Sequence, residues 1–151
     1  MSERFRGMQV IGFGHPGSEL RRELVDLVLA GTKTATAGLL VELELDEEEM
    51  PVAGMREVMI DAEDRYVGVI ETTECRVVRM AEVDDQFARD EGEGFADAAD
   101  WRAAHERFWS GYLDEIRDRL GDPGFALSDD TRIICQRFRL AERFAEPIPA
   151  G

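Results

Sequence analysis

The sequence predicts an α+β fold with roughly five or six strands and several helices in one domain. Segments that alternate between apolar and polar residues predict strands, and apolar residues three and four positions apart predict amphipathic helices. These segments do not follow a regular strand–helix–strand order, which argues against a doubly wound parallel sheet. A chain of 151 residues with 44% hydrophobic and 34% charged residues suits one folded domain spanning 1–151.

The first part of the chain is predicted to contain a strand, a helix, a loop and a second strand. The strand covers 8–13, and the helix covers 18–30 because a serine can cap its start and Gly31 can end it. Short side chains over 33–38 predict a loop. Over 39–45, leucine and valine largely alternate with glutamate, which is typical of a half-buried strand.

The rest of the chain is predicted to form helices and then return to the sheet. An aromatic stripe at helical spacing in the longer helix most simply packs in the core. Prolines near the C-terminus predict a loosely held tail. The predicted elements are a strand over 56–60, one bent strand or two over 66–78, a short helix over 83–90, a helix from about 97 to 120, a strand over 131–140 and a loose tail over 141–151.

The charge balance argues against one class of partner. Lys and Arg number 18 and Asp and Glu number 33, so the net charge is −15. A protein that coats duplex DNA needs cations facing the phosphates, and we therefore expect no such partner. A small positive pocket for one nucleotide or a short RNA is still compatible with this charge. With no long apolar run and no recognisable signal peptide, we expect a cytoplasmic protein without a membrane partner.

Lys33 is unusual because every other basic residue of the chain is arginine. A lysine amine can lose its proton when it is buried or close to another cation, which a guanidinium cannot do. A single lysine retained by chance is the plain alternative. The sequence shows no recognisable signal peptide, and neither Cys75 nor Cys135 has a CxxC partner or a nearby histidine. They are predicted to be small buried hydrophobic residues rather than disulfide partners or zinc ligands.

Two segments carry groups suited to chemistry. Residues 31–36, GTKTAT, place an amine and three hydroxyls among small side chains directly after a helix. They do not form a phosphate-binding P-loop, which lies between a strand and the start of a helix, and a tight connection is the alternative. Residues 87–94, FARDEGEG, hold carboxylates flanked by glycines. Such carboxylates can act as acid or base near a cation, or they can form a solvated loop.

Together these motifs make the chain resemble the ASCH domain family, a branch of the PUA-like β-barrel superfamily. The Gly-x-Lys-x-x-Thr motif of the family corresponds here to Gly31, Lys33 and Thr36, and longer members share a stretch like 88–94. A Trp-Arg-x-x-His block follows in family order and consists of Trp101, Arg102 and His105. The resemblance covers nearly the whole chain and implies a small PUA-like β-barrel with surrounding helices.

The resemblance also implies a function connected with RNA. Some members resemble RNA-binding PUA domains, some cleave RNA, and a bacterial branch hydrolyses acetylcytidine to cytidine and acetate. That branch uses the lysine and threonine of the motif with a later glutamate, which implies catalytic roles for Lys33, Thr36 and Glu91, with Glu93 as the alternative glutamate. A buried Lys33 amine would take a proton from Thr36 or a water, provided that a helix-like turn directs both side chains into one pocket. Glu91 would orient a water or protonate the leaving amine, whereas a charged Lys33 bound to phosphate is the alternative.

The other motif residues are expected to line the same cleft. Those predicted to bind substrate are Gly31, Thr34, Glu93, Trp101, Arg102 and His105. No metal-ligand spacing occurs, so we expect neither a metal nor another cofactor. The expected partner is a nucleoside or a short RNA, and the sequence carries no signal for an oligomeric state. Two further functions stay open: a noncatalytic RNA- or nucleotide-binding module, and a regulatory domain that binds a small ligand or a protein.

Three positions depart from the family pattern. Phe95 stands where an aspartate commonly follows the glycine loop, and Met55 stands where an aspartate commonly follows a glycine. Gln136 replaces a glutamate that is usual near the end of the domain. A glutamate lost from the cleft would change its electrostatics, so these departures bear on activity more than on fold.

Overall fold

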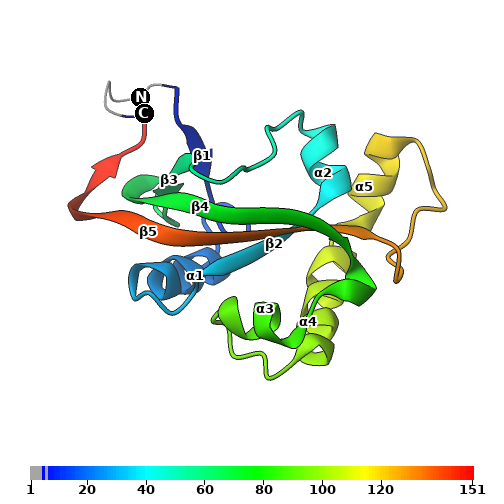
Figure 1. Cartoon of the computed structure of the whole chain (residues 1–151). Coiled ribbons are helices and arrows are strands. Elements are labelled where there is room, and N and C mark those ends of the chain that lie inside the picture. Colours follow the sequence, from blue (N-terminus) through cyan, green and yellow to red (C-terminus); the bar gives the residue numbers. More distant parts are fainter. Residues whose placement is uncertain (1–4, 6) are drawn as a thin grey trace. The chain divides into compact units, whose positions relative to one another are not determined.

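The computed structural model describes residues 5 and 7–151 and shows an α+β fold. Five strands form one mixed sheet in the order β1-β3-β4-β5-β2, in which the long strands β4 and β5 lie side by side (Figure 1). Because β1 and β2 stand at the two ends of this order, the sheet is open, and the closed barrel implied by the resemblance is not formed. The strands are β1 (Gln9–Ile11), β2 (Ala35–Leu39), β3 (Arg56–Ile60), β4 (Arg65–Arg79) and β5 (Arg132–Pro149).

The helices lie between the strands in the chain and follow no regular alternation with them. Their starts fit the polar caps that the sequence offers, since Ser18, Asp84 and Asp97 each accept a hydrogen bond from a backbone N–H in the first turn. The helices are α1 (Glu19–Leu29), α2 (Leu40–Leu45), the 3-10 helix η2 (Met80–Glu82), α3 (Asp85–Asp90), α4 (Ala98–Ser110) and α5 (Leu113–Leu120).

The chain divides into two compact units. Unit 1 contains the residues up to Thr34 together with 51–74 and 137–151, and unit 2 contains 35–50 and 75–136. Because β4 and β5 are long, each contributes residues to both units. Each unit has buried clusters of its own, so each can be described by itself.

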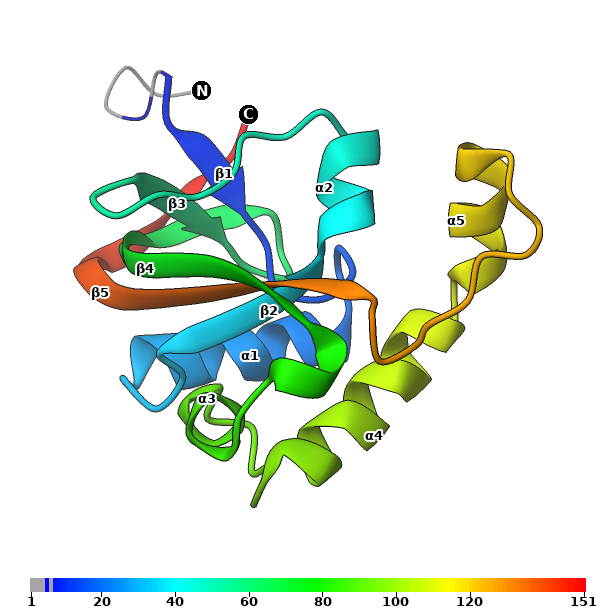
Figure 2. The ribbon, with the colours of Figure 1, turned by 45° about the vertical axis from the view of Figure 1, so that its right-hand side comes forward.

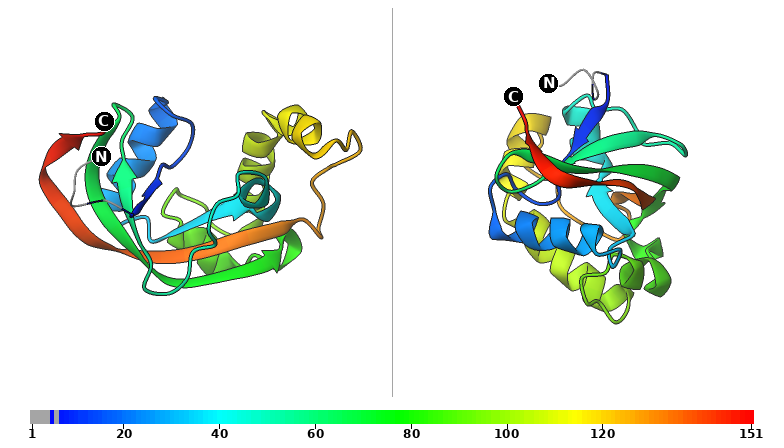
Figure 3. Two further views of the ribbon diagram at one scale, coloured as in Figure 1. Left: turned by 90° about the horizontal axis from the view of Figure 1, so that it is seen from above. Right: turned by 90° about the vertical axis from the view of Figure 1, so that its left-hand side faces the viewer.

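Unit 1 is built on β1, β3 and the first part of β4. β1 runs parallel to β3, and β3 runs antiparallel to β4 with a register shift between Met59 and Ile60. α1 packs against these strands through one apolar face, and Figure 3 shows the helix from two sides. The buried cluster formed by α1 and the strands comprises Phe13, Leu24, Val25, Val28, Met59, Val67, Ile70 and Phe138.

The C-terminal residues, which were predicted to form a loose tail, instead continue β5 as far as Pro149. The ring of Phe144 stacks on Phe5 with centroids 5.4 Å apart, and Phe5 meets Tyr66 edge-on at 5.4 Å. Ile148 packs against the same cluster. Apolar burial therefore holds the segment, which the proline count of the sequence did not reveal.

The buried cluster of unit 2 includes Trp101 and Trp109, which α4 presents on one face as the aromatic stripe predicted. The single helix predicted from 97 to 120 is, however, divided into α4 and α5, and Figure 2 shows the chain turning between them. The break lies at Gly111, where an added Cβ would be 3.3 Å from the carbonyl oxygen of Phe108. The turn allows Tyr112 at the start of α5 to donate a 3.0 Å hydrogen bond to Glu42.

The region between α1 and β3 also differs from the prediction. The predicted loop over 33–38 contains most of β2, and the predicted strand over 39–45 is the helix α2. Leucine and glutamate favour helices as isolated residues, and the contacts of α2 with α5 select this alternative. No helix among the described residues is both long and apolar enough to cross a membrane.

Candidate functional site

The motif lysine lies in a loop whose start is determined by the end of α1. Gly31 has a φ of +79°, the left-handed conformation that favours glycine after a helix. The N–H groups of Gly31 and Thr32 donate to the carbonyls of Val28 and Leu27 at 3.0 Å, the pair of bonds that defines a Schellman motif. Lys33 donates its own N–H to the Leu27 carbonyl at 3.1 Å. The motif glycine thus has a clear structural role in directing the chain toward Lys33.

Lys33 is deeply buried within unit 1, with an exposed fraction of 1%. Its Nζ atom lies 5.8 Å from the centre of the Phe13 ring, within range of a cation–π contact. Phe13 is held in turn by Arg21, whose Nε donates to the Phe13 carbonyl at 3.2 Å and whose Nη2 donates to the Gly14 carbonyl at 2.8 Å. Burial and the Asp64 and Asp61 charges act in opposite directions on the pKa of Arg21, and burial, which lowers it, is the larger effect.

Thr36 lies on β2 in unit 2 and is half-buried. The segment from Thr32 to Thr34 is not helical, and β2 is extended from Ala35 onward. Residues three apart in an extended chain do not share a face, and burial alternates along the segment, with Lys33 and Ala35 buried and Thr34 exposed. The helix-like turn that would direct Lys33 and Thr36 into one pocket is therefore absent.

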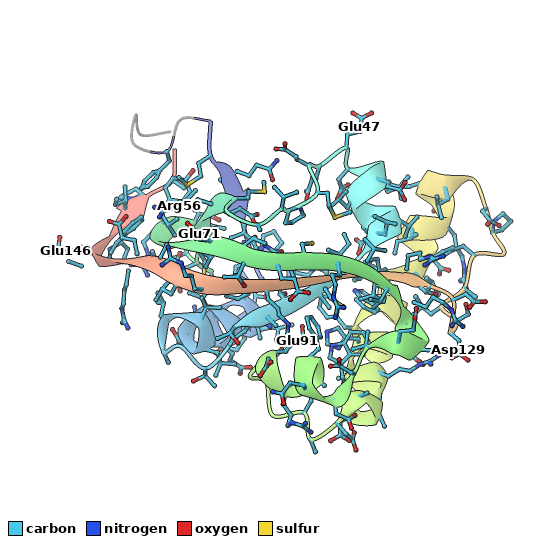
Figure 4. All side chains as sticks on the ribbon, viewed as in Figure 1. Glu47, Arg56, Glu71, Glu91, Asp129 and Glu146 are labelled. Atoms are coloured by element: carbon cyan, nitrogen blue, oxygen red, sulfur yellow. The ribbon has the colours of Figure 1, made fainter. Side chains whose placement is uncertain are left out.

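Glu91 stands at the end of α3 in unit 2. Asp84 caps the start of this helix by accepting the N–H of Phe87 at 2.8 Å, and Glu91 closes it by donating its N–H to the Phe87 carbonyl at 3.2 Å. Gly92 and Gly94 then turn the chain with φ of +72° and +95°. The Glu91 side chain is 1% exposed, and Figure 4 labels it beside α3. The segment 87–94, for which a solvated loop was the alternative prediction, therefore holds a buried carboxyl group.

Three predicted residues meet in unit 2. Nε2 of His105 lies 3.4 Å from Oε2 of Glu91, and Nδ1 of His105 lies 2.8 Å from the backbone carbonyl of Trp101. The imidazole stacks on Trp101 with centroids 4.3 Å apart. Trp101 is fully buried, and its indole N–H has no acceptor among the described residues. Its ring is thus part of the core and of the support for His105.

The side chain of Arg102 contacts two carboxylates rather than Glu91 or His105. Its Nε donates to Glu106 and its Nη1 donates to Asp129, both at 2.5 Å, and these two hydrogen bonds raise its pKa. Asp129 lies near the end of the chain segment that leads into β5 (Figure 4). With two carboxylates bound, this guanidinium does not offer a free charge to a phosphate.

The other predicted binding residues lie at different levels of exposure. Gly31 and Thr34 are exposed, and Glu93 is half-buried. The backbone carbonyl of Thr34 accepts the N–H of Phe138 at 3.0 Å, so this residue also joins the loop to β5. The described His, Cys, Asp and Glu side chains form no group of three that could hold a metal ion.

Some neighbours of the site were not predicted as functional residues. Phe13 contacts Lys33 from a distant part of the sequence, and Phe95, one of the departures, packs on His105 with centroids 5.6 Å apart. Burial raises the pKa of the Cys135 thiol to about 12, and the charge of Glu91 adds to this effect. The thiol therefore stays protonated and is a poor nucleophile, in keeping with its predicted packing role.

Comparison with known proteins supports the family resemblance. A family model of the ASCH domain matches residues 9–142. A crystal structure of an Enterococcus faecalis protein, assigned to family model DUF984, is 28% identical with a TM-score of 0.77, and the match covers 91% of this chain and 78% of that one.

A high-resolution crystal structure of an ASCH domain from Lactobacillus crispatus is 25% identical with a TM-score of 0.76, covering 93% of this chain and 84% of that one. No protein in the curated set matches the chain significantly. The family match over most of the chain and the similarity of two solved structures lead to the same assignment: the chain belongs to the ASCH domain family.

Proposed function

We propose that this ASCH domain is a hydrolase that acts on an acylated nucleoside, with the amide of acetylcytidine as its model substrate. In this proposal Lys33 and Glu91 carry the acid–base chemistry, and a water supplies the attacking oxygen. Thr36 is not given this role, because the chain from Lys33 to Thr36 lacks the helix-like turn that would direct both side chains to one place. We further place the fold in the PUA-like superfamily, with a sheet that stays open.

The observation that carries the proposal is the burial of Lys33 and Glu91. Each is 1% exposed, whereas the other buried charged residues among those described, Arg21, Glu57 and Asp61, are each 6% exposed. Removing an ionisable group from water is unfavourable, and such groups are retained in a fold where a partner or a reaction requires them. Both residues lie on motifs that the amidohydrolase branch of the family uses for catalysis.

The proposed reaction adds one water across the amide. The oxygen of a water attacks the carbonyl carbon while the amine of Lys33 accepts a proton from that oxygen. The C–N bond then breaks as Glu91 gives a proton to the leaving nitrogen, which releases the cytidine amino group. The proton on Lys33 returns to Glu91 through solvent, and the acetic acid formed ionises.

The charge of the protein favours a small substrate over a long one. The net charge of −15 repels an extended polyanion, whereas an acylated nucleoside carries no phosphate. The engagement of Arg102 by Glu106 and Asp129 supports the same choice, since the guanidinium of this predicted binding residue is held by two carboxylates.

The proposal is tested by the release of cytidine from acetylcytidine, followed by chromatography with the purified protein. Lys33→Met keeps much of the side-chain volume and removes the amine, and we expect kcat/KM to fall by about 10²–10⁴-fold. Thr32→Ala, an exposed substitution in the same loop, is the matched control and should retain activity. Glu91→Gln should lose activity to a similar extent, whereas Asp90→Asn on the same helix should not.

Two outcomes would contradict the proposal in different ways. Turnover that is unchanged in Lys33→Met and in Glu91→Gln would show that the reaction does not use these residues. Absence of turnover, together with nucleotide or RNA binding that weakens steeply with salt and is lost in Lys33→Met, would instead indicate a binding module with a charged Lys33.

A further inference from the structure

We propose that His105 is a positioning residue that holds Glu91 in place and shares one proton with it. The inference deepens the proposed function and rests on it for its catalytic meaning, but the pair itself can be tested without any turnover.

The hydrogen bond of Nδ1 determines the tautomer of His105. Nδ1 lies 2.8 Å from the backbone carbonyl of Trp101, and a carbonyl can only accept a hydrogen bond. Nδ1 must therefore carry a proton and donate it. Nε2 is then left to face Glu91 as either a lone pair or a second N–H.

The approach of His105 to Glu91 is favourable only if the pair holds a proton. Nε2 lies 3.4 Å from Oε2, which is within ion-pair range, although no hydrogen bond to this oxygen is formed among the described residues. Two unprotonated acceptors this close in a buried place would repel each other. Either His105 is the imidazolium and Glu91 the carboxylate, or His105 is neutral and Glu91 carries the proton. In both arrangements the pair contains one proton that neither residue holds independently of the other.

Aromatic rings keep His105 from turning away. The imidazole is stacked on Trp101 at 4.3 Å with an interplanar angle of 21°, and it packs against Trp109 at 5.1 Å and Phe95 at 5.6 Å. The histidine side chain is 14% exposed, against 1% for Glu91. A ring fixed on both sides and bonded at Nδ1 presents Nε2 to Glu91 in one orientation.

The charged and titratable groups around the pair come from several elements. Burial keeps the Cys135 thiol on β5 protonated, and the charges that act on this thiol are those of Glu91, Arg76 and Asp84, with a contribution from Cys75. On α4, Arg102 and Glu106 pair with each other.

The shared proton has a defined role in the proposed reaction. It is the proton that Glu91 gives to the leaving nitrogen as the C–N bond breaks. Loss of this proton lowers the net charge of the Glu91–His105 pair by one. The pair regains a proton before the next turnover. His105 does not touch the reacting atoms in this scheme, and it acts through Glu91.

The direct test uses the fact that the chain has only two histidines, His15 and His105. Imidazole nitrogen NMR over a pH titration reports the tautomer and the midpoint of each one. His15 is exposed and serves as the internal reference. We expect the Nδ1–H tautomer for neutral His105, and we expect Glu91→Gln to lower the titration midpoint of His105 by about one pH unit or more, with His15 unchanged.

The NMR test also has an outcome that overturns the inference. A His105 midpoint that does not move in Glu91→Gln would show that the two residues share no proton. A neutral ring protonated at Nε2 alone would contradict the tautomer on which the inference is built. The titration is repeated in Lys33→Met, and a midpoint that responds to Lys33 but not to Glu91 would equally contradict the pair. Because no substrate is needed, failure of the proposed function leaves these results interpretable.

The kinetic test asks whether the pair matters for turnover. His105→Gln keeps an N–H donor for Glu91 without a titrating group, and His105→Phe keeps the ring without a donor. We expect kcat to fall about tenfold or more in His105→Phe, with a smaller loss in His105→Gln and little change in KM for either.

His105→Gln should also remove the limb of the pH–rate profile that belongs to the pair, whereas His15→Gln should match the wild type. Equal losses in both His105 variants with an unchanged pH profile would indicate a role in packing only. Turnover that is absent in the wild type would count against the proposed function, while the NMR result would still decide the pair.

Discussion

The amine of Lys33 lies 5.8 Å from the centre of the Phe13 ring, and Arg21 holds the Phe13 backbone through a 3.2 Å hydrogen bond. The three residues form a chain of contacts within unit 1. Arg21 secures the turn after β1, the turn places the ring, and the ring faces the buried amine. The position of the motif lysine therefore depends on residues outside its own motif.

Replacement of Phe13 by leucine should impair the reaction more than it impairs folding. Leucine keeps the position apolar but removes the ring face, whose contact with a cation is worth about 0.5–2 kcal/mol. If that contact positions Lys33 in the transition state, kcat/KM for acetylcytidine falls by about 2- to 30-fold. Val25→Ala truncates the same buried cluster and is the control, and an equal loss of activity in both variants would argue against a specific role of the ring.

Introduction of a side chain at Gly12 should displace Arg21. An added Cβ would lie 2.4 Å from Nη2 of Arg21, and this guanidinium is buried and bonded to two carbonyls, so it cannot move without losing them. We expect Gly12→Ala to lower the free energy of unfolding by about 1–3 kcal/mol in urea denaturation. In an Arg21→Ala background the same substitution should have a much smaller effect, and additive losses in the double mutant would refute the clash.

The motif glycine should tolerate asparagine better than alanine. Gly31 has a φ of +79°, and nothing lies within 4 Å of a Cβ added there. The penalty thus comes from the backbone conformation alone, at about 1 kcal/mol for alanine and less for asparagine, which adopts this conformation more readily. Thermal unfolding of both variants measures the difference, and equal destabilisation by the two residues would show that a steric contact is involved after all.

The stability of unit 2 should depend on the protonation of Glu42. Burial raises the pKa of Glu42 above its ordinary value of 4.5, while the hydrogen bond from Tyr112 opposes this shift. Between the unfolded and folded pKa values the native state binds more protons than the unfolded state, so stability falls as the pH rises through that window. Glu42→Gln keeps an acceptor oxygen for Tyr112 and cannot titrate.

The unfolding free energy of Glu42→Gln should therefore increase relative to the wild type as the pH rises from about 4 to about 7. Denaturation curves at several pH values measure this difference. In a chain that keeps Glu42, Tyr112→Phe should make the free energy of unfolding depend more strongly on pH, because it removes the hydrogen bond that lowers the Glu42 pKa. A difference between Glu42→Gln and the wild type that is constant with pH would contradict the expectation.

Local patterns predicted the elements that have local causes. Ser18 and Gly31 bound α1 because a cap and a left-handed residue satisfy the ends of a helix within its own sequence. The strand predicted over 56–60 is β3, and the run over 66–78, predicted as one bent strand or two, is the single strand β4. The family was likewise recognised from the order of short motifs, each a few residues long, and the family match supports it.

Local patterns were wrong where distant contacts select between two conformations. The leucines and glutamates of 40–45 fit a strand by alternation and a helix by propensity, and the contact of Glu42 with Tyr112 accompanies the helix. The break between α4 and α5 and the ordered residues 141–149 have similar causes, since both depend on partners far along the chain.

The sequence by itself determined the α+β class, the approximate ends of α1 and α3, the family and the identity of the motif residues. Only the tertiary structure decided that Glu91 is buried beside His105, that Arg102 is already paired, and that Phe13 faces Lys33. The physical reason is the range of the forces. Caps, turns and alternation act between near neighbours, whereas the burial of a charge and the direction of a side chain depend on packing between segments that the sequence order does not bring together.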